Sequence, residues 1–149
     1  MIVSMKIRLR PAEPSDKEFV RQVHHLGYKD VVTRQFGTWD ETVQDSFFAK
    51  DWAKNKMEII LCDEKECGYA SRKRKPEFYW VGELVLLPKF QGCGIGSGIL
   101  RDVMTMAAAE NIPVRLQVLF ENYAHRLYLR LGFVDTGKTE THYLMEWNP

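Results

Sequence analysis

The 149-residue sequence lacks the usual marks of a secreted, membrane-spanning or metal-binding protein. Its three cysteines are odd in number and match no metal-ligand spacing, so we expect free thiols in a reducing, cytoplasmic setting. Residues 1–10 contain no apolar core, and we therefore expect no secretory signal peptide. The apolar run at residues 84–87 has the length of a strand and stops at Pro88, and we expect no membrane partner.

An excess of charge of either sign is also missing. The formal net charge is +1, which gives no reason to expect a nucleic acid as the main partner. The basic run at residues 72–76 is better interpreted as a solvated hairpin tip than as a nucleic-acid patch. Histidine, cysteine and carboxylate residues form no cluster with metal-ligand spacing along the chain, so we expect no metal.

The residues that are present have the composition of one soluble domain, which we expect to span residues 1–149. Hydrophobic periodicity predicts a strand, two helices, three strands, a helix, a strand, a helix and a terminal hairpin. The expected ranges are 6–10, a helix from Pro14, 40–54, 57–62, 67–71, 79–87, 94–111, 113–119, 123–131 and 133–147. Residues 27–39 remain unassigned. This order indicates an α/β layered domain around a mixed sheet.

The most informative segment is a glycine-rich turn between a buried strand and a long amphipathic helix. Glycines let the backbone take positive φ angles and let a ligand approach closely. The first turn of a helix also offers unpaired N–H groups with partial positive charge, so the turn suits a phosphate. The Walker pattern fails because Ser97 and Gly98 follow the last glycine, and the dinucleotide pattern G-x-G-x-x-G fails as well. A helix start that turns tightly and binds nothing is the simpler alternative.

Two motifs together give a more specific interpretation. Gln91, Gly94 and Gly96 match the pattern Gln/Arg-x-x-Gly-x-Gly/Ala after a strand. Some way downstream, a strand is followed by Asn122, Tyr128 and the pair at residues 132–133. With both motifs the sequence resembles the GNAT superfamily of N-acetyltransferases. The resemblance implies an α/β (α+β) domain with a mixed, mostly antiparallel central sheet of six to seven strands, flanked by about four helices.

The resemblance also implies acetyl-CoA as co-substrate and assigns residues to it. Pantetheine would pair with the main chain of the strand before the turn, and pyrophosphate would bind the N–H groups of the turn. The implied cofactor-binding residues are Leu84, Val85, Leu86, Gln91, Gly92, Cys93, Gly94, Ile95, Gly96, Ser97 and Asn122. Asn122 stands six positions before Tyr128, where an interval of seven is common in relatives.

Acyl transfer to an amine needs a proton acceptor for the ammonium and a proton donor for the departing thiolate. The family motif assigns the second role to Tyr128, for which an aromatic core residue is the alternative. Glu83 interrupts an apolar strand, so its burial should raise its pKa, which makes it the first candidate base. A structural carboxylate, or one that positions a water molecule, explains Glu83 equally well. His125 and His142 are the next candidates.

The acceptor is expected to be a small-molecule or peptide amine, bound between the first two helices and the terminal hairpin. Candidate linings are Phe36, Trp39, Asp40, Trp80, His142 and Tyr143. A metabolite, an antibiotic, a polyamine, a protein N-terminus and a lysine all remain open, as does the acyl chain. The hairpin is also a candidate pairing element for a homodimer.

No cysteine or serine has the partners of a nucleophile, which favours direct transfer in a ternary complex. Two other interpretations remain: a non-catalytic acyl-CoA-binding regulatory module, and an interaction domain that binds no cofactor.

Overall fold

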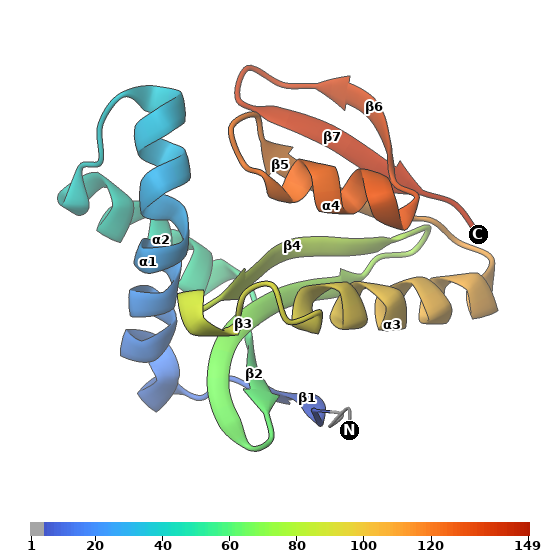
Figure 1. Ribbon diagram of the computed structural model, residues 1–149, viewed down its shortest axis with the longest axis horizontal. Coiled ribbons are helices and arrows are strands. Elements are labelled where there is room, and N and C mark those ends of the chain that lie inside the picture. The colour runs from blue at the N-terminus through green and yellow to red at the C-terminus, as the bar shows by residue number, and fades with distance from the viewer. Residues whose placement is uncertain (1–4) are drawn as a thin grey trace.

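A computed structural model describes residues 5–149, which form seven strands, four α-helices and two short 3-10 helices (Figure 1). The elements in chain order are β1 (Ile7–Pro11), η1 (Pro14–Asp16), α1 (Lys17–Phe36), α2 (Glu41–Lys54), β2 (Glu58–Cys62), β3 (Lys65–Arg74), β4 (Tyr79–Leu86), η2 (Pro88–Phe90), α3 (Ile95–Glu110), β5 (Val114–Leu119), α4 (Ala124–Leu131), β6 (Val134–Lys138) and β7 (His142–Trp147). The predicted order of strands and helices is confirmed. None of the helices in residues 5–149 is long and apolar enough to cross a membrane.

All seven strands belong to one sheet in the order β1-β2-β3-β4-β5-β7-β6. Neighbouring strands are antiparallel except for β4 and β5, which run parallel. The mixed, mostly antiparallel sheet with flanking helices that the sequence predicted is therefore confirmed. The two parallel strands pair only where they start, from Tyr79 to Val81 on β4, and they then diverge (Figure 1). From Gly82 to Leu86, no strand within residues 5–149 pairs with this edge of β4.

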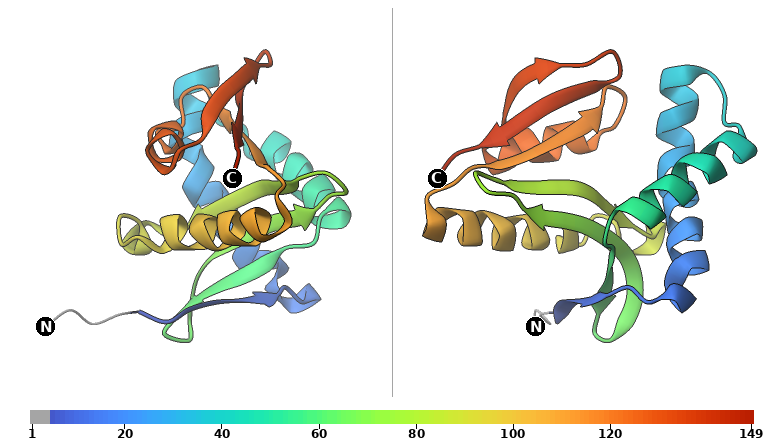
Figure 2. Two further views of the ribbon diagram at one scale, coloured as in Figure 1. Left: turned by 90° about the vertical axis from the view of Figure 1, so that its right-hand side faces the viewer. Right: turned by 180° about the vertical axis from the view of Figure 1, so that it is seen from behind.

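The helices cover the two faces of the sheet unequally (Figure 2). On one face, α1 and α2 pack on β2, β3 and β4 through a core that includes Val20, Phe48, Tyr69 and Val85. The opposite face of the same strands packs on the start of α3. The second half of α3 and α4 enclose the core around β5 and β7. Burial of these apolar side chains supplies the main driving force for the layered arrangement.

Helix α1 is longer than its sequence suggests, because it continues through the unassigned stretch to Phe36. Gly27 looks like a helix breaker in sequence, but the structure uses it for packing. A Cβ atom at this position would lie 2.4 Å from Cγ1 of Val85, so glycine lets α1 approach β4 closely. The helix ends at Gly37, whose φ of 84° is typical of a left-handed C-cap.

Two features of the chain differ from what the sequence pattern suggests. On α2, Val43 and Phe47 have the helical spacing of core residues with Phe48, but their side chains are 43% and 53% exposed. Only Phe48 is fully buried there, because α2 meets the rest of the protein along a narrow line. The basic run was expected to form a hairpin tip, but only Lys75 and Pro76 lie in the β3–β4 turn, because residues 72–74 belong to β3. Two of the residues at 72–74 form ion pairs, Arg72 with Glu58 on β2 and Arg74 with Glu110 on α3.

Candidate active site

A β-bulge in β4 sets the direction of Glu83. In the pairing with β3, Ser71 lies opposite Glu83 and Arg72 lies opposite Val81, which leaves Gly82 as the extra residue. The bulge reverses the alternation of side chains. Val81 therefore packs in the core beneath α3, whereas Val85 packs beneath α1 and α2. Glu83, two residues before Val85, lies on the same face. A Cβ at Gly82 would lie 2.6 Å from Oγ of Ser71, so the bulge requires glycine.

The carboxyl group of Glu83 is a weak acid in this setting. Burial raises its pKa to about 7, and the nearby charge of Asp51 on α2 acts in the same direction. The hydroxyl of Tyr69 lowers the pKa in part, and no cation contributes. A carboxyl that titrates near neutral pH can take up and release a proton during a reaction. The pKa shift expected from the sequence is present.

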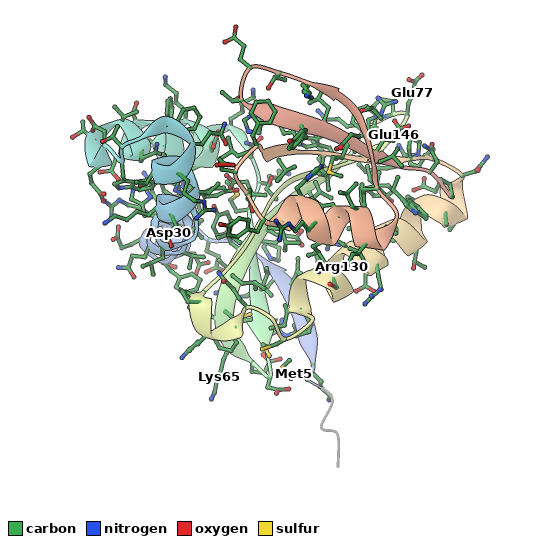
Figure 3. The ribbon with its side chains drawn as sticks, turned by 45° about the horizontal axis from the view of Figure 1, so that its top comes forward. Met5, Asp30, Lys65, Glu77, Arg130 and Glu146 are labelled. Atoms are coloured by element: carbon green, nitrogen blue, oxygen red, sulfur yellow. The ribbon has the colours of Figure 1, made fainter. Side chains whose placement is uncertain are left out.

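Tyr128 approaches the same region from the other half of the sheet. It lies on α4 and packs against Phe133, with 6.0 Å between the ring centroids. Burial raises the pKa of its hydroxyl to about 12, so the group keeps its proton at neutral pH and can act as a donor. The outer sides of the helices carry charged residues, such as Arg130 on α4 and Asp30 on α1 (Figure 3).

Two tyrosines that the sequence analysis missed surround Glu83. Tyr28 on α1 stands next to Gly27, and burial raises its pKa well above the ordinary value, with further contributions from Glu83 and Tyr128. Tyr28 thus lies near both candidate catalytic groups. Tyr69 on β3 is fully buried. The continued helical spacing of α1 could have indicated Tyr28, but no local pattern in the sequence distinguishes Tyr69 from an ordinary core residue.

The glycine-rich turn has the geometry expected of a phosphate site. Gly92 and Gly94 have φ angles of 71° and 82°, and a Cβ on either would have no neighbour within 4 Å. The N–H of Gly98 donates to the carbonyl of Gly94 at 3.0 Å, as in the first turn of a helix. The backbone N–H groups of residues 95–97, in the first turn of α3, have no partner within the helix and are available to an anion. The side-chain nitrogen of Gln91 donates to the carbonyl of Leu86 at 3.0 Å and ties the turn to β4.

The other residues assigned to the cofactor lie on both sides of this turn. Leu84, Val85 and Leu86 are on the part of β4 that has diverged from β5. Cys93 is exposed within the turn. Asn122 has a local task, because its side-chain oxygen accepts a hydrogen bond from the N–H of Ala124 at 2.9 Å where α4 begins. Its amide nitrogen is not used in that contact, and its contact with a cofactor stays a prediction.

The chain matches the family model described as acetyltransferase (GNAT) domain over residues 53–135. This match spans more than half of the chain and includes β4, the glycine-rich turn and α4. The chain belongs to the GNAT family of acetyltransferases. No curated protein sequence matches it significantly.

Several solved structures share the fold over nearly the full length. The PaiA N-acetyltransferase of Thermoplasma acidophilum, solved in complex with coenzyme A, is 18% identical with a TM-score of 0.78, covering 97% of this chain and 100% of that one. A domain from Methanocaldococcus jannaschii is 19% identical with a TM-score of 0.75, covering 98% and 100% of the two chains. Ard1 from Thermoplasma volcanium is 18% identical with a TM-score of 0.62, covering 95% and 97%.

The two histidines that competed with Glu83 for the role of base in this GNAT chain have other contacts. Nδ1 of His142 lies 2.7 Å from the hydroxyl of Thr141, and burial lowers the pKa of His142. His125 pairs with Asp135 at 2.9 Å and stacks on Tyr143, with 4.2 Å between the ring centroids. Their polar contacts are with the β6–β7 hairpin and not with Glu83.

Among the expected linings of the acceptor pocket, Trp39 and Asp40 are used at the start of α2. The indole of Trp39 donates to Glu41 at 2.7 Å, and the carboxylate of Asp40 accepts from the N–H of Val43 at 3.1 Å. Phe36 ends α1 and is half exposed, and Trp80 lies on β4 before the bulge. That any of these residues lines an acceptor pocket stays a prediction.

A group of potential metal ligands exists that the sequence spacing did not reveal. Ligand atoms of His25, Glu41 and Asp45 lie within 4.8 Å of one another where α1 meets α2. The guanidinium of Arg21 donates to Asp45 at 2.8 Å and to Glu41 at 3.0 Å. This arginine already supplies the positive charge that a metal ion would bring, so we assign no metal to the group. His24 and His25 on α1 are both buried.

A shallow hollow of about 470 Å³ lies beside this histidine group. Its lining residues come from η1 and the facing sides of α1 and α2, and they include Lys17, Glu18 and Arg21. None of the residues predicted for the cofactor or for catalysis lines it. The hollow is therefore separate from the candidate active site.

Proposed function

We propose that this GNAT protein is an acetyl-CoA-dependent N-acetyltransferase that transfers an acetyl group to a primary amine by direct attack in a ternary complex. One observation carries the proposal. A carboxyl group that titrates near neutrality, Glu83, and a protonated phenol, Tyr128, both lie near Tyr28, beside the part of β4 that diverges from β5. The first group suits removal of a proton from an ammonium, and the second suits protonation of a thiolate.

The proposed reaction divides the work between these two groups. Glu83 takes a proton from the ammonium of the acceptor, directly or through a water molecule. The free amine then attacks the thioester carbon, a C–N bond forms, and the C–S bond breaks. Tyr128 donates its proton to the departing sulfur, and the second proton lost by the attacking nitrogen restores the Tyr128 hydroxyl. Glu83 then releases its proton to solvent. No acyl group is attached to the protein at any stage.

The glycine-rich turn is proposed to bind the pyrophosphate of coenzyme A. The open space around Gly92 and Gly94 and the unpaired N–H groups at the start of α3 support this assignment. The free edge of β4 at Leu84–Leu86 offers main-chain groups to pantetheine, as it would to an added strand. The PaiA N-acetyltransferase of Thermoplasma acidophilum was solved in complex with coenzyme A, which supports coenzyme A as the ligand of this chain.

We further propose that residues 1–149 act as one cytoplasmic domain on a small-molecule or peptide amine, with the β6–β7 hairpin as a pairing element in a homodimer. Release of free thiol from acetyl-CoA in the presence of a panel of amines tests the proposed reaction. We expect release that depends on at least one primary amine. If the protein binds acetyl-CoA but no amine elicits release, the chain is a regulatory module that binds acyl-CoA.

A matched pair of glycine variants tests the phosphate site. We expect Gly94→Val to abolish acetyl-CoA binding in isothermal titration, because valine disfavours the positive φ at this position and its side chain fills the space over the turn. Gly98→Ala is the control, since Gly98 lies inside α3 with no neighbour within 4 Å of a Cβ. Circular dichroism of both variants verifies folding. Equal affinity in folded Gly94→Val protein would remove the pyrophosphate from this turn.

A further inference from the structure

The hydroxyl of Tyr69 is in an unusual position for a core residue. The side chain is completely buried, and its Oη is the sole buried side-chain nitrogen or oxygen in residues 5–149 that has no hydrogen-bond partner. Leaving a buried hydroxyl without a hydrogen bond destabilises the folded state. Phenylalanine would fill the same space without that cost, so packing alone does not explain a tyrosine at this position.

The sheet places this hydroxyl beside Glu83. Tyr69 on β3 pairs with Val85 on β4, and both belong to the core beneath α1 and α2. Glu83 is two residues before Val85 on the same face, which makes it the diagonal cross-strand neighbour of Tyr69. Long side chains reach one another across such a diagonal. The two groups interact, although they are not aligned as a hydrogen bond in this structure.

The other ionisable groups near Glu83 come from each element that packs around it. Tyr28 on α1 lies near Glu83, and Tyr128 on α4 lies near Tyr28. Asp51 faces it from α2, with Lys54 close to Asp51 itself. The negative charge of Asp51 raises the pKa of Glu83. Among these groups, Tyr69 is the one whose hydroxyl favours the charged form of Glu83.

We propose that Tyr69 is a positioning residue for the acetyl transfer, whose hydroxyl donates a hydrogen bond to Glu83 once that carboxyl has lost its proton. This inference rests on the proposed function, because it concerns the proton acceptor of the proposed reaction. The Tyr69 hydroxyl, which has no partner in this structure, then donates a hydrogen bond only to the ionised form of Glu83. It holds the carboxylate in one orientation and keeps enough of it ionised at neutral pH to accept a proton.

The test compares Tyr69→Phe and Asp51→Asn, which should change Glu83 in opposite directions. Removing the Tyr69 hydroxyl takes a donor from the charged carboxylate, so the pKa of Glu83 should rise by about one unit. Removing the Asp51 charge takes away a repulsion, so the pKa should fall by a smaller amount. The acidic limb of the pH profile of kcat/KM should move to higher pH in Tyr69→Phe and to lower pH in Asp51→Asn.

A second measurement keeps this test independent of activity. Carbon-13 NMR titration of the glutamate carboxyl groups, with Glu83→Gln to assign the signal, gives the pKa of Glu83 directly in each folded protein. An unchanged Glu83 pKa in Tyr69→Phe would overturn the inference and leave Tyr69 a packing residue. If the wild type acetylates no amine, the proposed function fails, while the NMR titration still decides the hydrogen bond.

Discussion

Two groups of ionisable side chains contact α1 at positions three residues apart, Tyr28 and His25. The pKa of the carboxyl in each group is shifted in the opposite direction. Around Tyr28 on α1, the carboxyl of Glu83 has no cation beside it, and burial raises its pKa to about 7. Around His25 on α1, the carboxyl of Asp45 accepts hydrogen bonds from Arg21 and lies 2.7 Å from Nε2 of His25, and both partners lower its pKa.

This difference in pKa indicates which of the two carboxyl groups can act as a proton acceptor near neutral pH. A carboxylate held by an arginine is stable in its charged form and is a poor proton acceptor. A buried carboxyl without a cation is poised between its two forms near neutral pH, at a cost in stability. The Asp45 group therefore stabilises the contact between α1 and α2 through its ion pair with Arg21. The Glu83 group has the properties of a catalytic centre.

The largest difference between the two groups should appear in the rate. We expect Glu83→Gln to lower kcat at pH 7 by a factor of about 10² or more, because a general base is lost. Asp45→Asn, at the other group, should leave kcat within about twofold, since Asp45 takes no part in proton transfer. Steady-state thiol release measures both. Equal losses in the two variants would show that rate follows the integrity of α1 and not the chemistry of Glu83.

Tyr128→Phe tests the proton donor of the Glu83 group. We expect kcat to fall by about 10² with little change in acetyl-CoA affinity, because the hydroxyl matters when the thiolate leaves. The ring remains to pack against Phe133. Tyr123→Phe is the control, since Tyr123 precedes the same helix and is 66% exposed. Activity of Tyr128→Phe within twofold of wild type would assign Tyr128 to packing.

The stability of Glu83→Gln should change in the opposite sense to its activity. The folded pKa of Glu83 lies above its ordinary value of 4.5, so this group stabilises the fold less as pH rises from about 4.5 to 7. We therefore expect the free energy of unfolding of Glu83→Gln, measured by denaturant titration, to exceed that of the wild type at pH 8 by at most about 3 kcal/mol. Near pH 4.5 the two proteins should be equally stable. A destabilised Glu83→Gln at pH 8 would contradict the raised pKa.

The smallest effect concerns the cation of the second group. Arg21→Met should lower the melting temperature at neutral pH by at most about 3 °C, because exposed ion pairs contribute little. The pKa of Asp45 is lowered in the folded protein, so its contribution is present above the ordinary aspartate pKa and is lost as pH falls below it. The difference from wild type should therefore disappear in strong acid or in 1 M salt. A difference that persists in both would indicate a packing role for Arg21.

The sequence predicts the parts of the site that depend on residues close together in the chain. The turn with Gly94 and Gly96 lies between a strand and the helix it opens, so its local pattern is sufficient to recognise it. Glu83 was a candidate because a charged residue is conspicuous in an apolar strand.

Tyr28 and Tyr69 were missed because their importance depends on distant parts of the chain. Gly27 looks like a break in the helix until Val85 is seen against it, and so the helical position of Tyr28 was not recognised. The position of Tyr69 depends on the register of β3 with β4 and on the bulge at Gly82. The metal-like group around His25 likewise joins residues of two helices, and only the structure shows that Arg21 is within it.

The most direct test of the account is the pH dependence of amine-dependent thiol release by the wild type and by Glu83→Gln. For the wild type, we expect kcat/KM to rise with an apparent pKa near 7, the value to which burial raises that of Glu83. For Glu83→Gln that limb should be absent, and activity should recover only at high pH, where more of the free amine is already deprotonated. A profile of unchanged shape and height in folded Glu83→Gln would contradict the assignment of Glu83 as the base.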